Sequence, residues 1–89
     1  MVSREVVLGN AKGLHLRPAG KVCDQALEYR SRTEMVIGSR TYNLKSVLSV
    51  LSAQVMDQRE VTVVCDGPDE KEALDAICSM LQSDLDNVG

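Results

Sequence analysis

The sequence predicts an α+β fold, an open-faced two-layer sandwich with a four-stranded antiparallel sheet and three helices on one face. Short β-branched segments and segments of helical periodicity follow one another in the order β-α-β-β-α-β-α. The chain has 89 residues, which suits a single domain over residues 1–89 with one small core. Hydrophobic residues make up 44% and charged residues 26%, the balance of a folded globular domain. Helices gathered on one side of such a sheet would bury one apolar layer.

The first strand is expected over residues 4–8, which are rich in valine, and a loop follows over residues 10–15. A helix then begins between His15 and Arg17, because Pro18 fits only in the first turn of a helix. Apolar residues recur there at spacings of three and four, which predicts an amphipathic helix. The recurring residues are Leu16, Ala19, Val22, Cys23, Ala26 and Leu27.

A hairpin and a short helix come next. Residues 33–37 and 40–43 are predicted strands, and the two-residue turn between them contains a glycine that can supply the positive φ of a type II′ turn. Ser46 is the expected N-cap of the short helix that follows. The apolar residues of that helix are Val47, Leu48, Val50 and Leu51.

Residues 60–65 are β-branched with little alternation, which predicts a central strand. A turn over residues 66–68 leads into the last helix. Asp69 is expected to cap this helix in a capping box with Glu72 three residues later. The predicted core stripe of the helix consists of Ala73, Leu74, Ile77, Cys78 and Leu81.

His15 is the only histidine of the chain, and it stands where the predicted loop meets the first helix. A single histidine is more often a surface or capping residue than a reactive one. Here, however, Arg17 follows two residues later, and the first turn of a helix presents unpaired N–H groups with partial positive charge. An imidazole, a guanidinium group and these amides would together suit a phosphoryl group.

The chemistry that these groups allow is phosphoryl transfer through His15. A neutral imidazole nitrogen can attack phosphorus, and a positive helix end favours the neutral form near pH 7. Arg17 and the helix amides would stabilise the charge of the transferred group. The sequence contains no Walker motif, metal-ligand cluster or acid–base pair of carboxylates. We therefore expect a carrier that is not an enzyme by itself, that uses no cofactor or metal, and that needs a donor and an acceptor protein.

Composition argues against several other classes of function. The chain has no Trp or Phe and a net charge of −3, so nucleic acid is not an expected partner. The first residues lack the apolar core of a signal peptide, and no apolar run reaches the roughly 20 residues that cross a bilayer. A cytoplasmic protein without membrane insertion is therefore expected. The chain has three cysteines, Cys23, Cys65 and Cys78, and an odd number argues against a set of disulfide bonds. Each lies among apolar neighbours, which predicts buried thiols.

Two segments resemble a known family. Residues 13–19 read Gly-Leu-His-Leu-Arg-Pro-Ala and resemble the active-site segment of HPr, the histidine-containing phosphocarrier of the phosphoenolpyruvate-dependent sugar phosphotransferase system. Residues 43–46 read Asn-Leu-Lys-Ser and resemble its regulatory serine segment. The resemblance implies an HPr-like fold, transfer of phosphate from enzyme I to Nδ1 of His15, and delivery to a IIA domain of a sugar permease. It implies that Arg17 stabilises the phosphate.

The resemblance also implies that an ATP-dependent HPr kinase/phosphorylase phosphorylates Ser46. The added phosphate would bring about two negative charges beside an apolar docking patch and would repel the acidic surface of enzyme I. The patch is predicted to consist of Leu16, Val47, Leu48 and Leu51, although Leu51 has an alternative place in the core.

Some positions depart from the usual family pattern and keep a second interpretation open. Leu16 stands where Ala or Thr is usual, and Gln54 and Gln58 stand where glycines are frequent. The alternative is an HPr-like regulatory module, of the nitrogen-related branch or a docking protein, that acts by binding partners rather than in sugar uptake. A generic ferredoxin-like domain is a third interpretation, but it gives no reason for His-x-Arg-Pro at a helix start. A single small docking face predicts a monomer.

Overall fold

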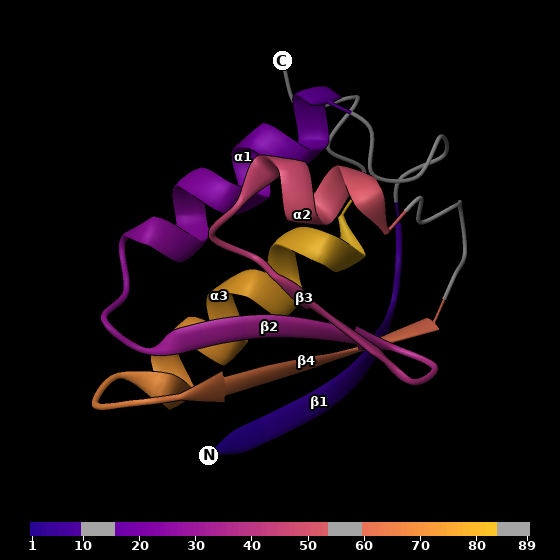
Figure 1. Ribbon diagram of the computed structural model, residues 1–89. Helices are drawn as coiled ribbons and strands as arrows, with labels where there is room; N and C mark the ends of the chain where they lie inside the picture. The colour runs from indigo at the N-terminus through magenta and orange to yellow at the C-terminus, as the bar shows by residue number, and fades with distance from the viewer. Residues whose placement is uncertain (10–15, 54–59, 84–89) are drawn as a thin grey trace.

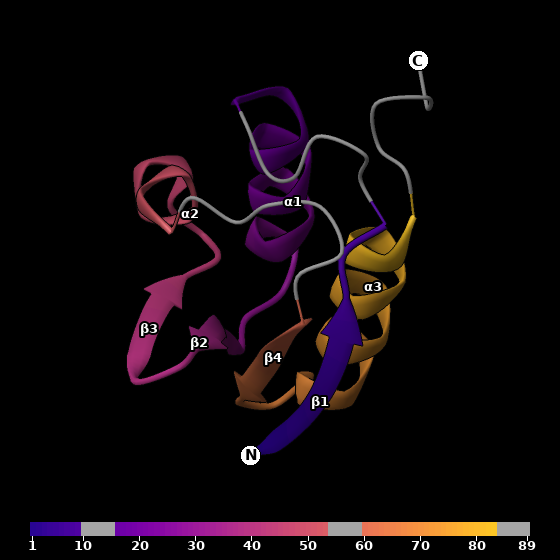
Figure 2. The ribbon, with the colours of Figure 1, turned by 90° about the vertical axis from the view of Figure 1, so that its right-hand side faces the viewer.

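The structure is a computed structural model that describes residues 1–9, 16–53 and 60–83. A four-stranded antiparallel sheet forms one layer, and three helices form the other (Figure 1, Figure 2). The predicted α+β sandwich with its helices on one face is confirmed. In chain order the elements are β1 (Val2–Val7), α1 (Leu16–Leu27), β2 (Arg32–Ile37), β3 (Arg40–Asn43), α2 (Val47–Ser52), β4 (Glu60–Asp66) and α3 (Glu70–Gln82).

The strand order in the sheet is β1-β4-β2-β3, so β4 is central as predicted. Val61, Val63 and Cys65 of β4 are buried under the helices, and the residues between them face the other side. Val61 pairs with Val6 of β1, and Val63 pairs with Met35 of β2, all of them buried. A slip of one residue would turn these side chains into water, so burial fixes the register.

The core lies between the sheet and the helices. Helix α1 packs against both α2 and α3, and all five residues of the predicted α3 stripe are buried. Four of the six recurring apolar residues of α1 are buried as well, but Leu27, which also fits the periodicity, is 61% exposed. Leu27 ends the helix, and the backbone N–H groups of Glu28 and Tyr29 bond to carbonyls three residues back. This turn leads the chain toward β2 and leaves Leu27 in solvent.

Element boundaries differ from the predicted ones by one or two residues. Strand β1 begins at Val2 and ends at Val7 because its ladder with β4 covers those residues. Leu8 is still buried, and the N–H of Gly9 donates to the carbonyl of Leu81 at 2.9 Å. A Cβ at Gly9 would collide with the backbone of Gln82, so the close approach to the end of α3 requires glycine.

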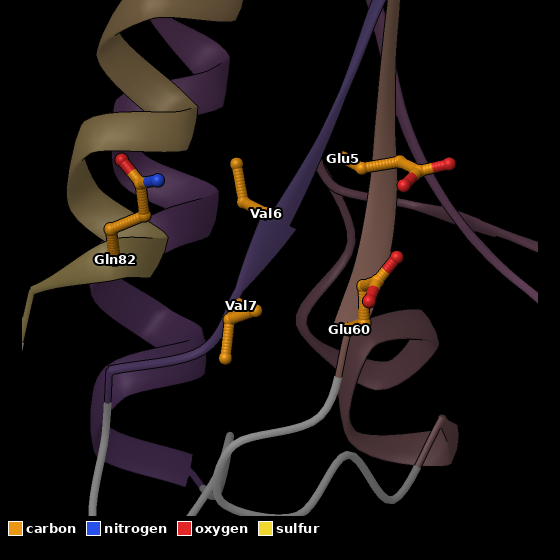
Figure 3. Close-up of a pocket in the computed structure, with 5 residues that line it drawn as sticks. All are labelled: Glu5, Val6, Val7, Glu60 and Gln82. Atoms are coloured by element: carbon orange, nitrogen blue, oxygen red, sulfur yellow. The ribbon is translucent and has the colours of Figure 1, made fainter.

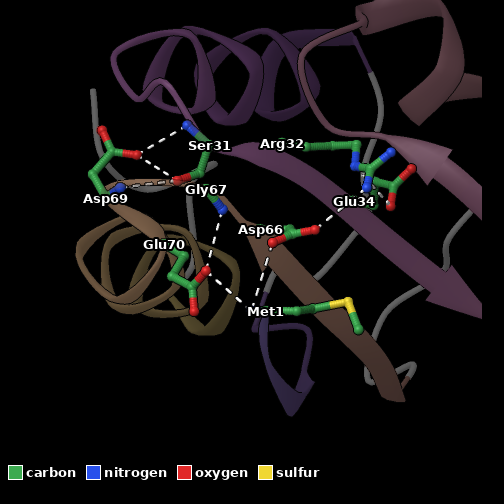
Figure 4. Close-up of polar contacts among 8 residues, drawn as sticks. All are labelled: Met1, Ser31, Arg32, Glu34, Asp66, Gly67, Asp69 and Glu70. Carbon is green, nitrogen blue, oxygen red and sulfur yellow. Dashed lines mark hydrogen bonds and ion pairs between the residues drawn. The ribbon is translucent and has the colours of Figure 1, made fainter.

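The predicted capping box at the start of α3 was wrong. Asp69 occupies the N-cap position, but its carboxylate makes no capping bond. It accepts the backbone N–H of Arg30 at 3.0 Å. It also accepts the backbone N–H of Ser31 at 2.9 Å and the Ser31 hydroxyl at 2.5 Å (Figure 4). These bonds, led by the one from the Ser31 hydroxyl, lower the pKa of Asp69 to about 2. Asp69 therefore ties the start of α3 to the segment between α1 and β2.

Gly67 makes this junction possible. It has a φ of +157°, and a Cβ there would lie 2.6 Å from Cα of Ser31. Its N–H donates to the Glu70 carboxylate at 3.2 Å, and that carboxylate also pairs with the Met1 ammonium at 3.1 Å. We call Ser31, Gly67, Asp69 and Glu70 the junction. It brings the chain entering β2 against the turn that leaves β4.

Candidate functional site

The start of α1 is the first part of the candidate site. The helix begins at Leu16, inside the predicted range, and Pro18 is buried in its first turn. Arg17 is exposed, and the first turn carries no acidic side chain. His15 and the loop before it lie outside the described residues, as does the side chain of Leu16. The described part of the site is therefore an exposed guanidinium group beside the amino end of a twelve-residue helix.

This arrangement suits an anion with several oxygen atoms. The unpaired N–H groups of a helix start carry about half a positive charge, and a guanidinium group offers parallel donors that match phosphate oxygens. Arg17 makes no hydrogen bond or ion pair with the described part of the chain. Its donors are thus not committed to a carboxylate of the described fold.

The start of α2 is the second part, and here Ser46 is the N-cap as predicted. Its backbone is extended, with φ −120° and ψ 117°, and its hydroxyl oxygen accepts the N–H of Ser49 at 3.2 Å. The N–H of Val50 donates to the Ser46 carbonyl at 3.0 Å, which closes the first helical turn.

The segment before Ser46 is held by contacts that sequence reasoning missed. The Asn43 amide oxygen accepts the N–H of Lys45 at 2.9 Å, and the N–H of Asn43 donates to the Ser49 hydroxyl at 2.8 Å. Lys45 Nζ donates to the carbonyl of Tyr29 at 2.8 Å. In an Asx turn, an asparagine side chain accepts the backbone N–H of the residue two positions later. The contact between Asn43 and Lys45 therefore had a local signal in the sequence. The bond to Tyr29 had none.

The residues of the predicted docking patch have different environments. Leu48 is 80% exposed and has the largest exposed fraction of any apolar side chain in the helices described. Val47 and Leu51 are half-buried and pack against the core, so part of each side chain supports the fold. Helix α2 itself packs against α1 (Figure 2). The structure therefore places a protruding leucine on the helix next to α1.

Cys23, Cys65 and Cys78 are buried and free, and burial raises the pKa of Cys65 to about 11. Within residues 1–9, 16–53 and 60–83, no three or more His, Cys, Asp or Glu side chains gather as metal ligands would. In the same ranges no helix combines the length and apolar character that a membrane crossing needs.

Comparison with known proteins identifies the family. The model of the family described as PTS HPr component phosphorylation site matches residues 2–83. The phosphocarrier protein HPr of Mycoplasma pneumoniae is 32% identical over 88% of this chain and 90% of that protein. The phosphocarrier protein HPr of Cupriavidus necator is also 32% identical, over 91% of each chain.

Solved structures agree with this match. HPr-C-His from Thermoanaerobacter tengcongensis superposes with a TM-score of 0.88 at 27% identity, over 92% of both chains. The phosphocarrier protein HPr of Bacillus anthracis superposes with a TM-score of 0.87 at 26% identity, over 91% of this chain and 96% of that one. The chain belongs to the HPr family, the phosphocarrier proteins of the phosphotransferase system, which carry a phosphoryl group and are not themselves catalysts.

Proposed function

We propose that His15 takes a phosphoryl group from phosphorylated enzyme I and passes it to a IIA domain. The observation that carries this proposal is the exposed Arg17 in the first turn of α1, two residues after His15 in the sequence. The imidazole Nδ1 would attack phosphorus as the bond to the donor breaks, and the reverse exchange would load the acceptor. The phosphoryl charge would be stabilised by Arg17 and by the first amides of α1.

Docking would use the apolar side chains around this helix start: Leu16, Val47, Leu48 and Leu51. Leu48 supports the assignment because it extends into solvent from α2. Leu48→Ala should raise the KM for enzyme I by about fivefold to tenfold, which corresponds to about 1 kcal/mol of binding free energy. Leu27→Ala is the matched control, because Leu27 is also exposed but lies at the far end of α1. Equal effects of the two variants would contradict the assignment of Leu48.

Ser46 is the proposed site of regulatory phosphorylation, with an HPr kinase/phosphorylase as the modifying partner. A phosphate on this residue would replace the hydroxyl contact to the N–H of Ser49 with a charged one. It would also place negative charge next to Val47 and Leu48, where an acidic partner surface would be repelled.

The carrier proposal is tested by intact mass after incubation with phosphoenolpyruvate and catalytic enzyme I of the same organism. The native chain should gain one acid-labile phosphoryl group, and His15→Ala should gain none. Circular dichroism of His15→Ala should match the native chain, which separates loss of the acceptor from loss of the fold. Equal labelling of both chains, or no labelling of either, would refute the role of His15.

A regulatory module is the second candidate, and one structural neighbour favours it. Crh of Bacillus subtilis, named a catabolite repression HPr, superposes with a TM-score of 0.78 at 30% identity over 94% of this chain. If the mass experiment shows no transfer through His15, partner binding without phosphoryl turnover becomes the better assignment.

A further inference from the structure

The sheet surface that faces away from the helices is left uncovered by the described segments (Figure 2). We call it the open face; its centre consists of Val36, Thr62 and Val64, and its acidic side chains are Glu5, Glu34, Glu60 and Asp66. Thr62 pairs with Glu5 on β1 and with Val36 on β2, and Val64 pairs with Glu34. These side chains therefore form one continuous surface over three strands.

The centre of the open face is apolar. Val36, Thr62 and Val64 are half-buried by their neighbours although no helix lies over them. Their methyl groups remain in partial contact with water, so covering this apolar surface would favour binding. Flat β-branched surfaces of this kind pack well against another protein surface.

Some acidic side chains of the open face lie near an arginine, and others have no cationic partner within the described ranges. Arg32 lies 3.9 Å from the carboxylate of Glu34 and 3.5 Å from that of Asp66. Within the described ranges no lysine or arginine pairs with Glu5 or Glu60. The edge of the face formed by β1 and the start of β4 is thus acidic.

Glu5 and Glu60 also interact with each other. Glu5 and Glu60 are diagonal neighbours across β1 and β4, and both point away from α3 (Figure 3). A hydrogen bond between them, together with their mutual repulsion, raises the pKa of Glu60. The pair borders a hollow of about 500 Å³ that Val6, Val7 and Gln82 also line. A cationic group entering here would replace the repulsion with attraction.

We infer that the open face docks a protein partner that presents lysine or arginine side chains around small apolar ones. Charge complementarity selects this occupant, since the acidic edge repels nucleic acid and anionic lipid. A second copy of the open face would bring like charges together. The face lies on the other side of the sheet from α1 and α2, so a partner here leaves the start of α1 accessible. This inference does not depend on phosphoryl transfer.

The test uses the full chain and a peptide of sequence Lys-Ser-Val-Ser-Val-Ser-Lys, in which one side of an extended strand presents lysines around two valines. Amide chemical shifts should change along β1, β4 and β2, with a dissociation constant of about 1 mM or lower. The double variant Glu5→Gln with Glu60→Gln should weaken binding by about fivefold to tenfold. The double variant Asp24→Asn with Glu28→Gln removes the same charge from exposed positions at the end of α1 and should leave binding unchanged.

Three results would overturn the inference. The first is binding of equal strength when both lysines of the peptide are replaced by glutamate. The second is equal weakening by the two double variants, which would show attraction to net charge alone. The third is that the free chain sediments as a dimer and that the open face forms the dimer interface. The occupant of the face would then be a second copy of the chain. Thermal unfolding of both double variants confirms that each is folded at the temperature used.

Discussion

The first turn of α1 and the junction beyond its last turn differ in how many hydrogen bonds their polar side chains make within the described part of the chain. At the first turn, Arg17 is exposed and makes no bond to the described part of the chain. At the junction, a single carboxylate, that of Asp69, accepts three hydrogen bonds from Arg30 and Ser31. The segment after α1 is thus held by bonds to Asp69, whereas Arg17 at the start of α1 has no bond within the described part of the chain and is free for the proposed phosphoryl group. If this division holds, a substitution at the first turn should leave the stability unchanged. A substitution at the junction should leave phosphoryl transfer by the folded protein unchanged.

The largest effect is expected at the first turn. Arg17→Ala should slow phosphoryl transfer to and from the chain by about 100-fold, because the proposed donor to the transferred group is lost. The midpoint of urea unfolding should not change, since Arg17 is exposed. Rapid-quench kinetics with enzyme I measures the rate. Arg30→Ala is the matched control, because it removes an exposed arginine next to the junction and should leave the rate unchanged. A similar loss of rate in both variants would indicate general charge attraction.

The next effect is expected at the junction and concerns stability. Gly67→Ala should lower the free energy of unfolding by about 2–3 kcal/mol, because the new methyl group meets the backbone of Ser31 in a strained conformation. Gly38→Ala is the control: its φ is +62°, but a Cβ there meets no atom within 4 Å, so its cost should stay at about 1–2 kcal/mol. Urea unfolding measures both. Phosphoryl transfer by the folded fraction of Gly67→Ala should be normal, and a slowed rate would break the division between the two ends.

The smallest effect appears only in acid. The folded pKa of Asp69, about 2, lies below its ordinary value of 3.8, so the ionised carboxylate stabilises the fold above that ordinary value. This contribution should disappear as the pH falls through the range between the two values. Tm measured from pH 7 to pH 2 should therefore fall more steeply for the native chain than for Asp69→Asn, and the two curves should converge in acid. Asp24→Asn is the control for loss of an exposed carboxylate, and the same convergence in that variant would contradict a special role of Asp69.

Much of the fold could be predicted because its signals are local. Pro18 limited where α1 can begin, short β-branched segments predicted the strands, and the spacing in α3 predicted its five buried residues. Ser46 was predicted as an N-cap for the same reason, since the bond to Ser49 spans three residues. His15 stays a prediction, because it lies outside the described residues.

What sequence reasoning missed depends on contacts between distant segments. Asp69 has the spacing of a capping box, but Ser31, 38 residues earlier, competes for its carboxylate once β2 and β4 are paired. Leu27 fits the periodicity of α1 and is still exposed, because the chain turns away at that residue. The contact between Glu5 and Glu60 likewise requires the register of β1 against β4. None of these outcomes can be predicted from the residues of a single helix or strand.

The central place of β4 also sets the timing of folding during synthesis. Among the described elements strand β1 leaves the ribosome first, but the strand it pairs with in the described sheet begins at Glu60, more than fifty residues later. At roughly 5–20 residues per second, β1 waits about 3–10 s for that partner. The hairpin of β2 and β3 can close locally in the meantime, whereas the remaining ladders of the sheet need β4. The nascent chain is thus expected to gain most of its resistance to proteolysis in one late step, when residues 60–66 emerge from the exit tunnel.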